Sequence, residues 1–215
     1  MQTETLVQTV HQVIHSIRNE NLLGRAYSRI ALVGFSIGAI VSNAIADKFP
    51  EDADSMVRLG VSWDLAWIYP AFLAGLQTAA SQVDPGRWGD LEAWYQTQPS
   101  LASRRAACFR GEFDEEALLV DYETRDTDTL GLAITFTHHL VAAPRYRGLV
   151  FLGIGEYDST FCPGRCGSQP YEVYDRFPKA AEHVVRVYEN TGHAVLHHHA
   201  GPSFMKDALD FLDGS

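Results

Sequence analysis

The pentapeptide Gly-Phe-Ser-Ile-Gly at 34–38 lies where a short apolar segment gives way to a helical one. The preceding run, residues 29–33, is rich in β-formers and bounded by glycine, as is typical of a buried parallel strand. The following residues, 39–49, have helical character. The segment therefore predicts a strand that turns sharply into a helix, with Ser36 in a strained backbone conformation and a glycine on either side to avoid clashes. An ordinary strand-to-helix turn is the plainer alternative.

Strand-like and helix-like segments alternate along much of the chain. Strands that alternate with helices predict a mostly parallel sheet with helices on both faces, which is the α/β class. The expected strands are residues 29–33, 56–60, 148–153 and 183–188, and the expected helices are 4–18, 39–49, 170–181 and 202–213.

Residues 64–145 differ in texture from the rest, because many aromatic side chains are spread over short helical patches divided by polar turns. We interpret this block as a helical insertion between two parts of one α/β core, residues 1–63 and 146–215. Open α/β sheets bind ligands at the carboxyl ends of their strands, so the insertion is expected to form a cap there. The expected substrate-binding side chains are Phe35, Trp63, Trp67 and Tyr69. Such aromatic groups could equally form the core of the cap.

Further features suit the chemistry of a nucleophilic serine. A serine hydroxyl needs a general base, and His193 follows the last expected strand in Thr-Gly-His-Ala, where a loop can reach back over the sheet. Asp158 ends Gly-Glu-Tyr-Asp after the preceding strand, and its carboxylate would hold the imidazole in the required tautomer. Asp64, after the second strand, and Glu156 are rival acids. The backbone N–H of Ile37, at the start of a helix, is expected to donate to an oxyanion.

The other histidines and the cysteines carry weaker signals. His197, His198 and His199 resemble a metal-binding group, but three adjacent residues cannot all face one point on a helix, so no metal site is expected. Cys162 and Cys166 enclose Pro-Gly-Arg and either close a short disulfide loop or remain two thiols. A disulfide would indicate an oxidising compartment.

The charge and hydropathy of the chain limit the classes of partner that it is expected to bind. The formal net charge of −10 argues against nucleic acid and anionic membrane, both of which attract basic surfaces. No run approaches the roughly 18 apolar residues that a membrane span requires. Residues 1–20 are amphipathic and lack the continuous apolar core of a signal peptide. A cytoplasmic location is the default expectation, with secretion as the alternative if the natural N-terminus lies upstream.

Three segments together resemble the α/β-hydrolase superfamily, and most of all its fungal serine hydrolases with a helical cap. They are residues 30–49, Gly-Glu-Tyr-Asp at 155–158 and Thr-Gly-His-Ala at 191–194. The resemblance covers nearly the whole chain. It implies an eight-stranded sheet, a Ser-Asp-His triad beneath a cap, no cofactor, and hydrolysis of an ester-like bond.

The chain departs from this family at its beginning. Family members place several strands, and a loop with a His-Gly-type motif that supplies a second oxyanion donor, before the helix that precedes the serine turn. Here the chain starts at that helix, so the strand at 29–33 is expected to have an unpaired apolar edge, which invites aggregation or a partner strand. A truncated gene model, a degenerate remnant and a second chain that completes the sheet are three explanations, of which truncation is favoured.

The leading hypothesis is a serine hydrolase that cleaves a carboxylic ester, lactone or thioester of a hydrophobic small molecule through an acyl-enzyme. In this hypothesis Ser36 attacks, His193 takes and returns the proton, and Asp158 orients His193. Epoxide hydrolases and dehalogenases of this fold would need a carboxylate at the position of Ser36. The alternative is a catalytically impaired or non-enzymatic remnant that acts as a binding or interaction module. Without a second oxyanion donor, we expect weak catalysis from residues 1–215.

Overall fold

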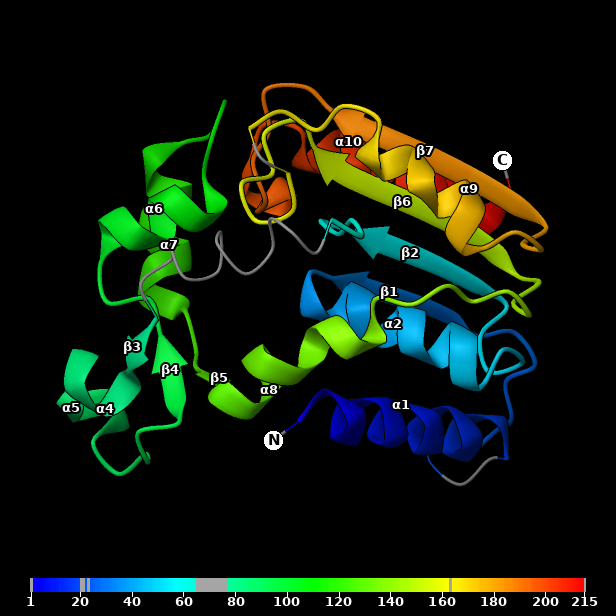
Figure 1. Ribbon diagram of the computed structural model, residues 1–215, viewed down its shortest axis with the longest axis horizontal. Helices are drawn as coiled ribbons and strands as arrows, with labels where there is room; N and C mark the ends of the chain where they lie inside the picture. The colour runs from blue at the N-terminus through cyan, green and yellow to red at the C-terminus, as the bar shows by residue number, and fades with distance from the viewer. Residues whose placement is uncertain (1, 20–21, 23, 65–76, 163, 215) are drawn as a thin grey trace.

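The computed structural model describes residues 2–19, 22, 24–64, 77–162 and 164–214. A parallel sheet flanked by helices forms the larger part (Figure 1). The strands of this sheet point with their carboxyl ends toward a second part of the molecule, which holds short helices and short antiparallel strands. Loops that follow the parallel strands therefore meet the second part, and the candidate site forms there.

Four strands form the main sheet in the order β1-β2-β6-β7. They are β1 (Ala31–Phe35), β2 (Ser55–Leu59), β6 (Leu149–Gly155) and β7 (Glu182–Tyr188). Every adjacent pair is parallel. This confirms the α/β class, and each strand overlaps one of the four runs that the sequence predicts.

Helices cover both faces of the sheet because the inner strands are apolar on both sides. α2 (Ile37–Lys48) packs on the face that carries Val150 and Leu152 of β6. α10 (Gly201–Asp213) packs on the opposite face, against Phe151. Each of these three side chains is 0% exposed, and complete burial of such a group stabilises the fold by about 1.5–3 kcal/mol.

α1 (Thr3–Arg18) packs on α2 and forms an outer layer. Its apolar residues recur at helical spacing, as the sequence predicts. Val7 and Ile14 are buried against Val41 and Ile45 of α2. The N-terminal helix is thus fastened to the helix that begins immediately after Ser36.

β1 is an edge strand and pairs only with β2 among the described residues. Leu32 packs against the core on the side of α2, but Val33 is 65% exposed and Phe35 is 40% exposed. Alternate side chains of a strand point to opposite faces, and no described element covers the second face here. The expectation of a fully buried strand is therefore wrong for that face, while the unpaired edge is observed.

The block 64–145 is not the purely helical insertion that its sequence predicts. Its described part also holds a three-stranded antiparallel sheet in the order β3-β4-β5. Strands this short are too brief for an alternating pattern to be visible in the sequence. The elements are β3 (Thr78–Ala79), α4 (Ala80–Val83), α5 (Pro85–Trp88), β4 (Tyr95–Thr97), α6 (Leu101–Cys108), α7 (Glu115–Thr124) and β5 (Asp128–Thr129).

The end of the block returns to the core. α8 (Leu130–Thr135) contacts α1, and η1 (Phe136–His139) contacts α2. Phe136 and Leu140 belong to the hydrophobic core beneath the parallel sheet. The last part of the block, from α8 onward, therefore packs on the core. The remaining elements are η2 (Gln169–Glu172), α9 (Val173–Arg176) and η3 (Val195–His197).

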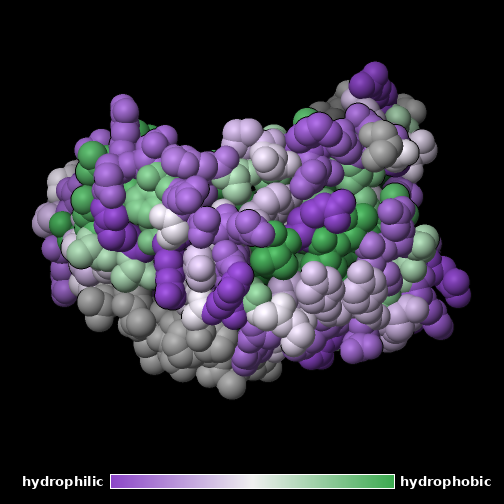
Figure 2. Space-filling view, turned by 90° about the horizontal axis from the view of Figure 1, so that it is seen from above, coloured by the Kyte–Doolittle hydropathy of each residue, from purple (hydrophilic) through white to green (hydrophobic). Residues whose placement is uncertain are grey.

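Hydrophilic side chains predominate on the face shown in Figure 2, and hydrophobic ones lie between them in separate patches. The outline of this face is hollowed between two raised ends. Within the ranges that the structure describes, no helix is long and apolar enough to cross a bilayer.

Arg58 is a charged side chain within the core. It lies on β2 and is 0% exposed. Its guanidinium lies over the rings of Trp63, at 4.6 Å, and Phe177, at 5.1 Å. Nη2 donates to Asn43 Oδ1 at 3.2 Å, but Nε and Nη1 have no hydrogen-bond partner. Burial lowers the pKa of Arg58 to about 9, because removing a cation from water disfavours its charged form.

We predict that Arg58→Met raises the free energy of unfolding near neutral pH by about 1–4 kcal/mol, since an apolar side chain of similar size often replaces a buried ion without loss. Below a pH of about 9 both the folded and the unfolded state carry the proton of Arg58, so the free-energy cost of burying its charge is complete there. This cost falls as pH rises above about 9, where the folded state loses the proton first. Urea unfolding near neutral pH and at about pH 10 tests both points. Arg58→Ala, which leaves a cavity, should destabilise. A less stable Arg58→Met would mean that the ring contacts outweigh desolvation.

Candidate active site

Ser36 lies at the turn between β1 and α2. Its φ of 52° and ψ of −115° place it outside the regions that most L-residues adopt, a conformation that costs about 1–3 kcal/mol. Its N–H donates to Leu59 O at 2.8 Å and extends the β1–β2 pairing by one residue. Its side chain makes no capping hydrogen bond to α2. The strained turn expected from the sequence is present, and the hydroxyl is left for other contacts.

The two glycines that flank Ser36 have different roles. A Cβ on Gly34 would lie 2.5 Å from the backbone C and O of Gly38, a distance that the turn cannot accommodate without moving. A Cβ on Gly38 would meet nothing within 4 Å. Close approach therefore requires glycine at the first position only, although the sequence motif suggests that both are needed.

We predict that Gly34→Ala lowers the melting temperature and abolishes the reactivity of Ser36, because the added methyl forces the turn open. The matched variant Gly38→Ala should retain both properties, since its Cβ enters open space and alanine favours a helix by up to about 1 kcal/mol over glycine. Thermal melts and labelling by a fluorophosphonate measure the two effects. Equal losses in the two variants would contradict this account of the turn.

Ser36, His193 and Asp158 form one hydrogen-bonded chain across the carboxyl ends of three strands. His193 Nδ1 lies 2.8 Å from Asp158 Oδ2, and His193 Nε2 lies 3.0 Å from Ser36 Oγ. Asp158 is 0% and His193 is 5% exposed. A carboxylate can only accept, so Nδ1 donates to Asp158 and Nε2 is left to accept the serine hydroxyl proton. The three residues singled out from the sequence therefore lie within hydrogen-bond distance.

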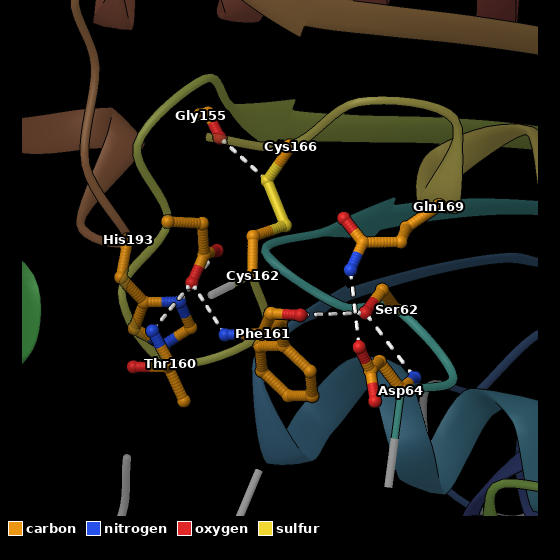
Figure 3. The surroundings of a disulfide bond; sticks show 10 residues. Ser62, Asp64, Gly155, Thr160, Phe161, Cys162, Cys166, Gln169 and His193 are labelled. Atoms are coloured by element: carbon orange, nitrogen blue, oxygen red, sulfur yellow. Dashed lines mark hydrogen bonds and ion pairs between the residues drawn. A yellow bond between two sulfur atoms is a disulfide. The ribbon is translucent and has the colours of Figure 1, made fainter. Parts of the chain in front are cut away.

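The Asp158 carboxylate is held from its other side by backbone groups. Thr160 N and Phe161 N each donate to Oδ1 at 3.0 Å. These bonds leave Oδ2 facing the imidazole of His193. Asp64, the rival acid, instead accepts from Gln169 Nε2 at 3.1 Å (Figure 3).

A disulfide closes the loop that follows Asp158. Cys162 and Cys166 are joined, so the first of the two alternatives left open by the sequence holds (Figure 3). Cys162 N donates to Asp158 O at 2.8 Å, and Cys166 N donates to Glu156 O at 2.7 Å. Glu156, the other rival acid, accepts from Asn190 N at 2.9 Å through Oε2. Glu156 thus links the disulfide loop to the loop of the histidine.

Gly60, which follows β2, is a site residue that the sequence did not indicate. Its φ is +61°, and a Cβ there would lie 3.2 Å from His193 Nδ1 and Cε1 and 3.0 Å from the ring of Phe35. The rings of Phe35 and His193 are 4.8 Å apart. Glycine at this position therefore leaves space for the imidazole. Its only signal in the sequence is a glycine at the end of a strand.

His198 supports the loop that carries His193 and was also missed. It is 4% exposed and stacks on Phe109 with ring centroids 5.4 Å apart. Nδ1 lies 2.8 Å from Ala194 O, and Gly192 N donates to Nε2 at 3.1 Å. Both bonds hold residues adjacent to His193. Burial lowers the pKa of His198, although its bonds to backbone carbonyls oppose this.

The neighbours of His198 point elsewhere. His199 Nε2 lies 3.1 Å from Asp114 Oδ1, and His197 Nε2 lies 3.9 Å from Asp121 Oδ1. The three adjacent histidines therefore contact different partners.

We predict that His198→Ala lowers both stability and turnover, because the loop of His193 loses two anchors. Since burial lowers the folded-state pKa of His198 below its ordinary value of 6.5, the unfolded chain takes up the proton first. The stability that the neutral ring confers is therefore present above a pH of about 6.5 and lost as pH falls below it. Urea unfolding as a function of pH should show a shallower acid decline in the variant. His199→Ala is the matched control, and an identical effect in both variants would remove the special role of His198.

A cavity of about 280 Å³ opens onto Ser36 and His193. Its apolar wall combines side chains from the β1–α2 turn, η1 and the loop of the acid. Cys108 also reaches this wall, and burial raises the pKa of its thiol to about 11, so it is not a competing nucleophile at neutral pH. The apolar lining residues are Phe35, Ile37, Ile40, Phe136 and Phe161.

The lining of the cavity also includes the polar side chains of Gln98, Arg104 and Asp128. Arg104 is fixed there: Nε lies 2.5 Å and Nη2 lies 2.8 Å from the two oxygens of Asp121, and Nη1 donates to Gln98 Oε1 at 3.2 Å. Burial acts against the charge of Arg104, but the bonds to Asp121 and nearby acidic groups outweigh it and raise its pKa. Burial likewise raises the pKa of Asp128, although Arg104 acts in the opposite direction. Gln98, Arg104 and Asp128 therefore offer both donors and acceptors to a bound molecule.

The structure places the residues expected to bind substrate in different surroundings. Phe35 lines the cavity. Trp63 does not: it is 4% exposed and packs in the core beside Arg58 and Phe177, so its position departs from the expected role. Trp67 and Tyr69 lie outside the described residues. An apolar ring near the end of a strand suits a core and a pocket equally, which is why the sequence does not separate these roles.

This combination of a parallel sheet flanked by helices and a strand–serine–helix turn is the architecture of the α/β-hydrolase fold, and solved structures of that fold match the chain along its whole length. The chain is similar to a monoacylglycerol lipase from Paleococcus ferrophilus, with a TM-score of 0.63 and 15% identity over 99% of this chain and 75% of the lipase.

Two further solved structures agree. An α/β-hydrolase fold protein from Chitinophaga pinensis has a TM-score of 0.60 and 14% identity over 100% of this chain and 73% of its own. A structure from a study of carboxylesterases of Nitrososphaera gargenis has a TM-score of 0.60 and 17% identity over 99% of this chain and 72% of its own. No family model matches the sequence, and no curated protein does. At these identities the likeness shows the fold.

Proposed function

We propose that this chain is a serine hydrolase that cleaves a carboxylic ester, or a related lactone or thioester, through an acyl-enzyme. The observation that carries the proposal is the continuous hydrogen-bonded chain from Ser36 Oγ through His193 to Asp158 at the wall of a cavity. A serine hydroxyl is a weak nucleophile unless a base removes its proton, and this geometry supplies one. Lipases and carboxylesterases among the similar structures support the same chemistry.

In the proposed reaction Ser36 Oγ attacks the carbonyl carbon while its proton passes to His193 Nε2. Asp158 stabilises the imidazolium through Nδ1. The N–H of Ile37, in the first turn of α2, has no acceptor within the helix and would donate to the oxyanion. His193 then protonates the leaving alcohol. A water, deprotonated by His193, attacks the acyl-enzyme and releases the acid and Ser36.

The cavity suggests a substrate with an apolar body and a polar group. Phe35 and Phe161 would contact the apolar part beside Ser36. Arg104 and Asp128 would bind the polar part, as donor and acceptor respectively. The sequence predicts only a hydrophobic substrate, and the polar lining residues add a polar group to that expectation. The finer likeness to fungal capped hydrolases, with residues 64–145 as a cap, remains part of this proposal.

We predict that the purified chain reacts with a fluorophosphonate at Ser36 and hydrolyses short p-nitrophenyl esters. Ser36→Ala should abolish labelling, and Asp158→Asn should lower turnover by about 10⁴-fold, because the imidazole adopts the wrong tautomer. Asp64→Asn is the matched control and should be close to wild type. The proposal fails if the folded protein neither labels nor hydrolyses, or if Asp64→Asn and Asp158→Asn lose equal activity.

A binding or interaction module is the second candidate, and the exposed edge strand favours it. Val33 is 65% exposed on a strand whose outer edge has no partner among the described residues. Such an edge offers unpaired backbone groups to another strand, whether from a second chain or from an upstream segment. Failure of a fluorophosphonate to label Ser36 in the folded protein would favour this second candidate.

A further inference from the structure

His11 and His15 lie one turn apart on α1, so both rings are on one face of the helix. Their rings are 4.8 Å apart, edge to face. Asp52, in the turn between α2 and β2, approaches the same face, and its Oδ2 lies 2.7 Å from His11 Nδ1. One ligand atom from each of the three residues lies within 4.8 Å of the other two. Two imidazoles and a carboxylate thus converge from segments 41 positions apart.

The surroundings fix two of these three groups. The ring of His11 stacks on Phe49, with centroids 3.7 Å apart and planes inclined by 12°. Asp52 is 8% exposed; its N–H donates to Phe49 O at 2.9 Å, and its carbonyl accepts from Arg18 Nη2 at 2.9 Å. His15 is exposed and makes no hydrogen bond through its ring among the described residues. Two groups are therefore preorganised and the third is free to turn toward them.

We propose that His11, His15 and Asp52 bind a divalent transition-metal ion of the zinc class. Two imidazole nitrogens and one carboxylate oxygen suit zinc and similar ions better than calcium or magnesium, which prefer oxygen ligands. An ion that lies about 2.0–2.2 Å from each ligand atom would take the place of the proton shared by His11 and Asp52. Rotation of His15 closes the third contact, and water completes a tetrahedron.

The proposed metal site is remote from the candidate active site, and this distance determines the role of the ion. α2 has 12 residues and rises about 1.5 Å per residue, so its two ends lie about 18 Å apart. Ser36 precedes one end, and Phe49 and Asp52 follow the other. The ion therefore joins α1 to the turn after α2 and stabilises the fold, without taking part in the reaction of Ser36.

The experiment uses the full chain without a histidine tag, stripped with a chelator and titrated with zinc chloride in a calorimeter. We expect one ion per chain, and a melting temperature raised by about 5–11 °C when zinc exceeds its dissociation constant about 100-fold. Cobalt should give the visible absorption of a tetrahedral site, whereas magnesium should shift nothing.

His15→Ala is the decisive variant, because it removes a ligand but leaves the His11–Asp52 hydrogen bond and the fold intact. It should weaken zinc binding by about 100-fold and reduce the thermal shift to about 1 °C at the same zinc concentration. His199→Ala, which removes an exposed histidine bonded to Asp114, should bind zinc like the wild type. The proposal is overturned if the wild type binds no zinc at micromolar concentrations, or if His15→Ala binds it as tightly. Ester hydrolysis is not a readout here, so this result stands apart from the proposed reaction.

Discussion

The parallel register of the main sheet is the constraint on which the candidate site depends. Phe35 pairs with Leu59, and Leu59 pairs with Gly153, so neighbouring strands end at nearly the same level. Hydrogen bonds continue this register past the strand ends: Ser36 N donates to Leu59 O, and Gly60 N donates to Gly153 O at 2.9 Å. The loops that follow the strands therefore start side by side, and short loops are enough to bring a hydroxyl, an imidazole and a carboxylate together.

Features that depend on nearby residues could be predicted from the sequence. A run of β-formers, a glycine-flanked serine and an apolar helix face are local patterns, and the structure contains each where it was expected. The candidate acid and histidine were predicted from the Ser-Asp-His order of the fold that the sequence resembles, and the sheet explains that order, because each parallel strand delivers its following loop to the same edge. Asp158 and His193 follow successive strands, β6 and β7, so their order along the chain already implied that they meet.

Features that depend on contacts between distant segments could not be predicted. Gly60 matters because the His193 ring approaches it, and Trp63 is buried because Arg58 and Phe177 surround it. Neither relation has a local pattern. The antiparallel sheet β3-β4-β5 could not be predicted for a different reason, since strands of two or three residues are too short to show a period. His198 was visible only as one of three adjacent histidines, and its role follows from bonds to the neighbours of His193.

The disulfide has a consequence for how the candidate site responds to its surroundings. Closing so short a loop removes about 2 kcal/mol of chain entropy from the unfolded state by the usual polymer estimate. This stabilisation is small for the whole fold, but it acts on the backbone that begins at Asp158, whose carbonyl accepts from Cys162 N. The order of the carboxylate is therefore thermodynamically linked to a thiol–disulfide equilibrium. Next to its candidate acid, the chain therefore carries a covalent bond that reductants outside the protein can break.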